Sequence, residues 1–126
     1  MHLTFHELCA IAKENIRECT VEDVIGMRNS NDDFILIDIR EDNEYNKAHI
    51  KGAKHIGRGI LERDIHMFVH DHSKKLVLYC GGGYRSALAA ESLQKMGYTN
   101  VISMDGGWRR WNALGGEIEV SPNHSE

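Results

Sequence analysis

The sequence contains little proline, few cysteines and no long apolar run. Pro122 is the only proline among the 126 residues, so no proline-rich linker divides the chain. Fifteen Lys and Arg against 19 Asp and Glu give a formal net charge of −4, which leaves no broad basic surface for nucleic acid. The apolar runs 34–37 and 76–80 are far shorter than the roughly 20 residues that cross a bilayer. We therefore expect one domain that binds neither nucleic acid nor a membrane.

The three cysteines, Cys9, Cys19 and Cys80, cannot all pair within one chain and are too few for a disulfide framework. Residues 1–7 have neither the basic and apolar regions of a secretory signal nor an Arg-rich transit pattern. Both observations predict a cytoplasmic protein with free thiols. Cys9 and Cys19 are expected to pack in the interior, although a resolving or sulfur-accepting role for them is left open.

Apolar runs and helical patterns alternate along the chain. The short continuous runs 34–39, 76–79 and 101–104 predict strands that are covered on both faces. Helical spacing is found from residue 5 to residue 16 and from 61 to 69, and the alanine-rich segment 86–96 before Gly97 predicts another helix. The sequence therefore predicts an α/β protein with a mainly parallel central sheet flanked by helices on both faces.

Cys80 directly follows the predicted strand 76–79, and Gly81-Gly82-Gly83-Tyr84-Arg85-Ser86 leads from it into the next helix. Ligands of open α/β sheets bind beyond the carboxyl ends of the strands, which is where Cys80 is placed. Three glycines allow the loop to curl around the sulfur with its N–H groups directed inward, and the helix adds its positive N-terminal end. We expect these groups and Arg85 to lower the pKa of Cys80 and to make it a nucleophile.

Four blocks in chain order resemble the rhodanese domain family in its small single-domain form. They are similar to the family's first strand with its Asp-x-Arg, its His-Ile-Pro-Gly-Ala block, its active loop and its Gly-Gly-Trp segment, and they comprise residues 36–45, 48–53, 80–86 and 106–111. The resemblance covers residues 20–120, which we predict to be a rhodanese-like domain. Residues 1–19 are predicted to be an N-terminal helical extension, and residues 121–126 a C-terminal tail.

The resemblance implies a sulfurtransferase in which Cys80 takes the sulfane sulfur of a donor such as thiosulfate and becomes a persulfide. The outer sulfur then passes to a thiol, to cyanide or to the thiol of a partner protein, and no metal or organic cofactor is expected. The loop residues Gly81, Gly82, Gly83, Tyr84, Arg85 and Ser86 would bind the substrate and the persulfide. Gly81 and Gly82 stand where good thiosulfate users of the family carry basic residues, so the donor is left open, as is the choice between monomer and homodimer.

Two other classes of function compete with this interpretation. Cysteine phosphatases and arsenate reductases also hold a thiolate in a nest of amides, but they place five residues between the cysteine and the arginine. Here four residues, 81–84, separate Cys80 from Arg85, and this smaller loop suits a single sulfur atom. A non-catalytic interaction or redox-sensing module is the other alternative. Loss of the cysteine would have favoured it, but Cys80 is present.

The remaining polar candidates are predicted to be structural. Asp38 and Arg40 fit an ion pair at the end of a strand, and Arg58 fits a solvated loop arginine, although a part in the site is left open for all three. His66, His70 and His72 are assigned to a solvated helix end instead of a metal site. Trp108 and Trp111 are assigned to packing.

Overall fold

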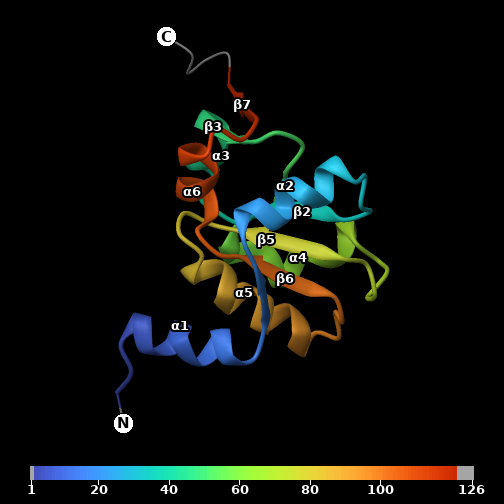
Figure 1. The fold of residues 1–126 in the computed structure, drawn as a ribbon. Coiled ribbons are helices and arrows are strands. Elements are labelled where there is room, and N and C mark those ends of the chain that lie inside the picture. The colour runs from blue at the N-terminus through green and yellow to red at the C-terminus, as the bar shows by residue number, and fades with distance from the viewer. Residues whose placement is uncertain (1, 122–126) are drawn as a thin grey trace.

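The computed structural model describes residues 2–121, so residues 122–126 of the predicted tail lie outside the described residues. Five strands form a parallel sheet in the order β1-β6-β5-β2-β4 (Figure 1). Their bounds are Arg17–Cys19 (β1), Ile35–Asp38 (β2), Lys54–His55 (β4), Leu76–Tyr79 (β5) and Val101–Met104 (β6). Strands β3 and β7 form a separate antiparallel pair, Ala48–Ile50 with Ile118–Val120. The predicted α/β class with a mainly parallel sheet is confirmed.

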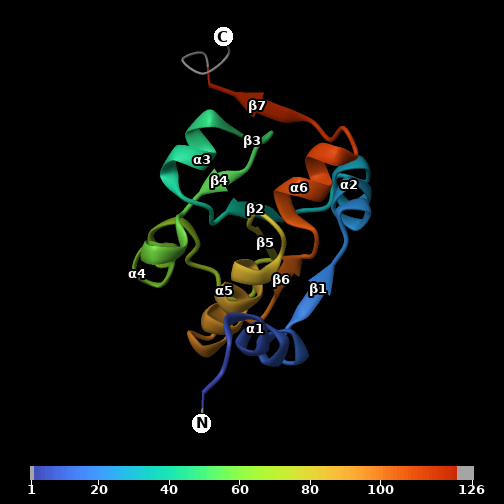
Figure 2. The same cartoon turned by 90° about the vertical axis from the view of Figure 1, so that its left-hand side faces the viewer.

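Helices cover both faces of the sheet, as predicted. Helices α4 and α5 pack on one face, whereas α2 and α6 pack on the other (Figure 2). Helix α1 packs against α5 instead of against the sheet. The helices are α1 (Phe5–Glu14), α2 (Val21–Asn29), α3 (Asp42–Lys47), α4 (Leu61–Phe68), α5 (Tyr84–Lys95) and α6 (Gly107–Ala113), with a 3-10 turn η1 (Arg58–Ile60) before α4.

The central strand β5 divides its side chains between two cores. Leu76, Leu78 and Cys80 belong to the cluster beneath α4 and α5, whereas Val77 and Tyr79 belong to the cluster beneath α2 and α6. Successive side chains of a strand point to opposite faces, so both faces must be apolar where both are covered. This alternation turns Cys80 toward α5, the helix that follows it in the chain.

Several short elements were not predicted because they carry no apolar pattern. Only one of the three residues of β1 is buried, since β1 lies at the edge of the sheet, and α3 has no buried residue. Strand β1 places residues 17–19 of the predicted helical extension in the sheet. Helix α5 begins at Tyr84, two residues earlier than predicted, because Gly83 adopts a φ of +98° immediately before the first turn.

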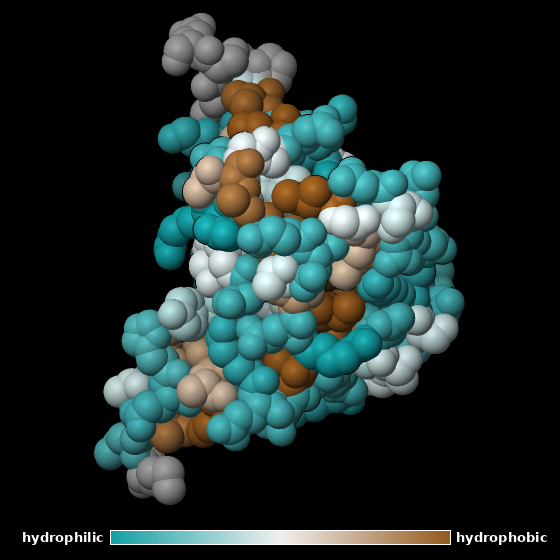
Figure 3. Space-filling model, in the orientation of Figure 1, coloured by the Kyte–Doolittle hydropathy of each residue, from teal (hydrophilic) through white to brown (hydrophobic). Residues whose placement is uncertain are grey.

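The surface is mainly polar in Figure 3, with apolar patches at the end that carries β7 and α6 and at the end that carries the N-terminal helix. Four large apolar side chains at the N-terminal end are exposed, namely Leu3, Phe5, Leu8 and Ile11. On the opposite side of α1, Cys9 and Ala12 are buried. Within residues 2–121, none of the helices combines the length and the hydropathy needed to cross a bilayer.

A buried ion pair lies at the carboxyl end of β2. Arg40 Nη2 donates to Asp38 Oδ2 at 2.8 Å and to the Ala48 carbonyl at 2.7 Å, and Tyr79 Oη donates to Asp38 Oδ2 at 2.5 Å. Both side chains of the pair are almost completely buried, and the Arg40 guanidinium lies 4.5 Å from the centre of the Trp108 ring. Asp38 and Arg40 thus form the structural ion pair that the sequence favours, and they contact the first turn of α6 through Trp108.

We predict that Asp38→Ala lowers the free energy of unfolding by roughly 3–5 kcal/mol, because Arg40 would remain buried without its carboxylate. Urea unfolding followed by circular dichroism measures the loss. Glu117→Gln is the matched control, since Glu117 forms an exposed ion pair with Lys51 and its loss should change stability little. Equal stability losses in the two variants would contradict a structural role for the buried pair.

Candidate active site

The loop after β5 lies where the order of the strands reverses direction. From β2 the chain continues to β4 on one side, and it then crosses to β5 on the other side of β2. The carboxyl ends of such neighbouring strands form the usual ligand crevice of open α/β sheets. Cys80, the first residue after β5, stands at this crevice.

The first turn of α6 holds the peptide groups of the loop. The Trp108 N–H donates to the Cys80 carbonyl at 2.8 Å, and the Arg109 N–H donates to the Gly81 carbonyl at 3.1 Å. The C=O and N–H of a trans peptide point in opposite directions. The N–H groups of Gly81 and Gly82 are therefore directed away from α6.

Two glycines are required for this close approach. Gly107 has a φ of +51°, and a Cβ there would overlap the Cys80 carbonyl oxygen. Gly83 has a φ of +98°, and a Cβ there would lie 3.2 Å from both the Asp105 Cα and the backbone nitrogen of Gly106. An L side chain at either position would therefore meet backbone atoms as well as an unfavourable φ.

The sulfur of Cys80 is surrounded by hydrogen-bond donors. Its Sγ accepts from the N–H groups of Gly83 at 3.2 Å and Ser86 at 3.4 Å, and it lies 3.5 Å from Ser86 Oγ. Ser103, on β6, holds Ser86 Oγ at 2.8 Å. Burial by itself raises the pKa of the Cys80 thiol. Hydrogen bonds from the Ser86 side chain and from the amides of Ser86, Gly83 and Gly82 lower the pKa by more than burial raises it, so the pKa lies below its ordinary value.

The other two cysteines have the opposite electrostatic environment. Burial raises the pKa of Cys9, whose thiol donates to the Tyr84 carbonyl at 3.6 Å. Burial likewise raises the pKa of Cys19 to about 12. Among the three, only Cys80 has a lowered pKa, as a nucleophile needs.

A pocket of about 150 Å³ opens onto the loop. Its lining comprises Phe5, Cys80, Gly81, Gly82, Tyr84, Arg85 and Arg109. Gly83 and Ser86 of the predicted site are buried and contact the sulfur without lining this pocket.

The sequence did not predict Phe5 and Arg109 as site residues. Phe5 comes from the helix outside the recognised blocks, whereas Arg109 directly follows Gly106-Gly107-Trp108 and could have been found there. Ser103 was also missed, and its only signal is a polar residue within an apolar strand.

The two arginine candidates are paired with carboxylates. The sequence predicts that Arg85 helps to lower the pKa of Cys80. The largest lowering effects come from the hydrogen bonds described above, and the Arg85 guanidinium lies 3.8 Å from Glu44 and 4.0 Å from Glu41. Arg58 is not free in solvent, because it pairs with Glu62 at 2.7 Å, and it does not line the pocket beside Cys80.

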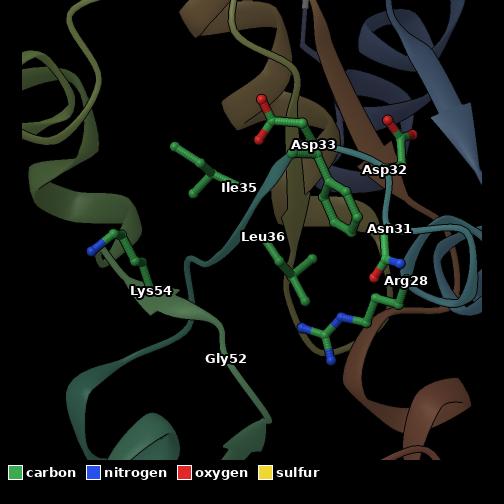
Figure 4. A pocket seen from close by; sticks show the side chains of 9 residues that line it. Arg28, Asn31, Asp32, Asp33, Ile35, Leu36, Gly52 and Lys54 are labelled. Carbon is green, nitrogen blue, oxygen red and sulfur yellow. The ribbon is translucent and has the colours of Figure 1, made fainter.

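A larger pocket of about 470 Å³ lies at the amino ends of β2 and β4 (Figure 4). Cys80, by contrast, follows the carboxyl end of β5. Arg28 and Lys54 contribute cationic side chains to the larger pocket, but no cysteine or histidine lines it. Its carboxylates Asp32 and Asp33 are paired with lysines of the loop before β5. The smaller pocket is therefore the candidate active site, because it contains the activated thiol.

The three histidines assigned to a solvated helix end, His66, His70 and His72, are exposed at the end of α4 and in the loop after it. The rings of His66 and His70 meet edge to face with their centres 5.0 Å apart, and His72 stacks on Tyr98. Within residues 2–121, no three His, Cys, Asp or Glu side chains are grouped so that they could hold a metal ion.

We predict that Ser86→Ala raises the pKa of Cys80, because the substitution removes the hydroxyl donor and leaves the amide. Titration of the thiolate absorbance near 240 nm should then show a midpoint at higher pH, with less thiolate at neutral pH. Ser92→Ala on the same helix is the control, since its hydroxyl bonds Glu62 instead of the sulfur. A midpoint that is unchanged or lower in Ser86→Ala would contradict this role.

Comparison with known proteins matches residues 20–114 to the Rhodanese-like domain. The thiosulfate sulfurtransferase GlpE of Stutzerimonas stutzeri is 32% identical over 90 residues, covering 71% of this chain and 79% of that protein. Three other curated relatives, from Bacillus subtilis and Schizosaccharomyces pombe, are longer, and the chain spans 51–64% of their lengths.

Two of the solved structures that match nearly the whole chain are informative about function. One is a Rhodopseudomonas palustris protein of unknown function that is described as a possible tyrosine phosphatase. It has a TM-score of 0.85 and 33% identity, covering 94% of this chain and 96% of its own. The other is the homodimeric polysulfide-sulfur transferase of Wolinella succinogenes. It has a TM-score of 0.78 and 27% identity, with coverage of 97% and 91%.

Proposed function

The chain belongs to the rhodanese-like domain family, and on this basis we propose that it is a sulfurtransferase with Cys80 as its persulfide carrier. The observation that carries the proposal is the sulfur of Cys80 within a ring of donors, with its pKa lowered despite burial. Gly81 to Ser86 form the substrate and persulfide loop. The names of the Stutzerimonas and Wolinella relatives support sulfur transfer as the reaction class.

In the first half-reaction, the Cys80 thiolate attacks the sulfane sulfur of the donor. A bond forms between Sγ and that sulfur, and the donor's S–S bond breaks. With thiosulfate, sulfite leaves with the electron pair, and Cys80 becomes a persulfide anion. The inward N–H groups of the loop supply fixed partial positive charge for the anions on both sides of this step, without reorganisation of the loop.

In the second half-reaction, a thiolate or cyanide attacks the outer sulfur of the persulfide. The new bond forms to the acceptor, and Cys80 Sγ leaves with the electron pair as a thiolate. A thiol with a lowered pKa is a better leaving group, so the hydrogen bonds that generate the nucleophile also assist its release. This sequence is ping-pong catalysis.

The pocket size limits the partners of this reaction. A space of about 150 Å³ admits a small sulfane compound, or the extended thiol of a small molecule or a partner protein. Both a monomer and a homodimer are compatible with the proposal, and the Wolinella relative is a homodimer.

We expect the wild type to gain one sulfur atom during incubation with excess thiosulfate and to lose it to cyanide, as measured by intact-protein mass spectrometry. Cys80→Ser should gain none, because the serine hydroxyl is far less acidic and less nucleophilic. Cys9→Ser is the control and should still be modified, since burial raises the pKa of Cys9. Failure to react with thiosulfate, mercaptopyruvate and polysulfide alike would favour the non-catalytic interaction or redox-sensing module.

A phosphatase is the second candidate, because of the description of the Rhodopseudomonas structure. The loop argues against it, since only four residues separate Cys80 from Arg85, and the Arg85 guanidinium is directed toward Glu41 and Glu44. We therefore predict no hydrolysis of p-nitrophenyl phosphate above the level of Cys80→Ser. Turnover that depends on Cys80 and is inhibited by vanadate would reverse the order of the two candidates.

A further inference from the structure

Arg109 extends from the first turn of α6 over the two loop glycines next to Cys80. A Cβ on Gly82 would lie 2.9 Å from Arg109 Nη1, and a Cβ on Gly81 would lie 3.6 Å from Arg109 Nη2. The same point on Gly81 is 4.0 Å from Arg85 Nη2. The two guanidinium groups therefore converge at the pocket, above the part of the loop that has no side chains.

The two arginines differ in their neutralisation. Arg85 lies within 4.0 Å of both Glu41 and Glu44, and Arg110, next to Arg109, pairs with Glu22 at 3.0 Å. For Arg109, no carboxylate of residues 2–121 lies within 4.0 Å of the guanidinium. Arg109 thus contributes the uncompensated positive charge at the mouth of the pocket.

We propose that Arg109 binds the anionic head of the sulfur donor and makes this site selective for small dianionic sulfane donors such as thiosulfate. The inference rests on the proposed function and identifies a specificity-determining residue for it. A guanidinium presents parallel N–H donors that match two oxygens of a sulfonate-type head. Gly82 is part of the same arrangement, because a side chain there would displace the guanidinium.

The charge of Arg109 opposes a repulsion inherent in the reaction. A thiolate and a dianionic donor must come into contact, and their like charges raise the energy of the encounter. The total charge stays the same when the Cys80 thiolate and thiosulfate become a persulfide anion and sulfite. A fixed cation beside the loop therefore favours binding of the dianion and has less effect on a neutral donor.

The test compares Arg109→Gln with Arg110→Gln in a thiosulfate-to-cyanide assay. Arg109→Gln should raise the KM for thiosulfate about tenfold, which is the factor that about 1.4 kcal/mol produces, with a smaller change in kcat. The deficit should shrink as ionic strength increases, because salt screens an exposed charge. Arg110→Gln should have a KM close to that of the wild type, because its guanidinium pairs with Glu22 away from the pocket.

Two further measurements distinguish a donor-binding role of Arg109 from a purely structural one. The first uses a neutral sulfur donor, and the second moves the positive charge from position 109 to position 82. With dimethyl trisulfide, the loss in Arg109→Gln should be several-fold smaller than with thiosulfate. In the double variant Gly82→Lys with Arg109→Gln, a cation returns to the same space from the loop, so the KM for thiosulfate should fall back toward the wild-type value.

Three results would overturn the inference. They are an unchanged KM in Arg109→Gln, equal losses with both donors, and no recovery in the double variant when circular dichroism shows that it is folded. Each would leave the proposed function intact as long as the wild type still forms the Cys80 persulfide. Absence of a wild-type persulfide with every donor would instead refute the sulfurtransferase itself.

Discussion

Two hydrogen bonds from the first turn of α6 to the carbonyls of Cys80 and Gly81 determine the shape of the site. Because the C=O and N–H of a peptide point in opposite directions, these bonds direct the N–H groups of Gly81 and Gly82 away from α6. The Gly82 N–H is one of the amides that stabilise the thiolate. The contact requires Gly107, since any Cβ there would overlap the Cys80 carbonyl. Helix α6 thereby orients the nucleophile's loop although it contributes no nucleophile.

The buried ion pair at the end of β2 packs directly against α6. Arg40 is held by Asp38 and by the Ala48 carbonyl, and its guanidinium lies against the ring of Trp108, whose amide bonds Cys80. Tyr79, at the end of β5, also donates to Asp38, so the pair connects the neighbouring strands β2 and β5 with the helix that holds the loop.

Opposite electrostatic effects meet at Cys80. Burial by itself would favour the neutral thiol, but donors from the loop and from Ser86 hold the anion. At the pocket mouth, Arg85 is balanced by carboxylates, whereas Arg109 lies over a loop without side chains. A hydrogen-bonded anion beneath an unpaired cation suits transfer of sulfur from a charged donor, which links the proposed function to the proposed role of Arg109.

The sequence alone determined the α/β class, the strand before Cys80 and the glycine-rich loop after it, because these follow from local periodicity and from glycine in consecutive positions. The sequence did not predict strand β1 and helix α3, because neither has an apolar face that periodicity could reveal. Only the tertiary structure placed Ser103 behind Ser86 and Arg109 above Gly82, and only it paired Arg85 with glutamates. These contacts join segments that are distant along the chain, so they depend on the packing of helices and strands that no local pattern contains.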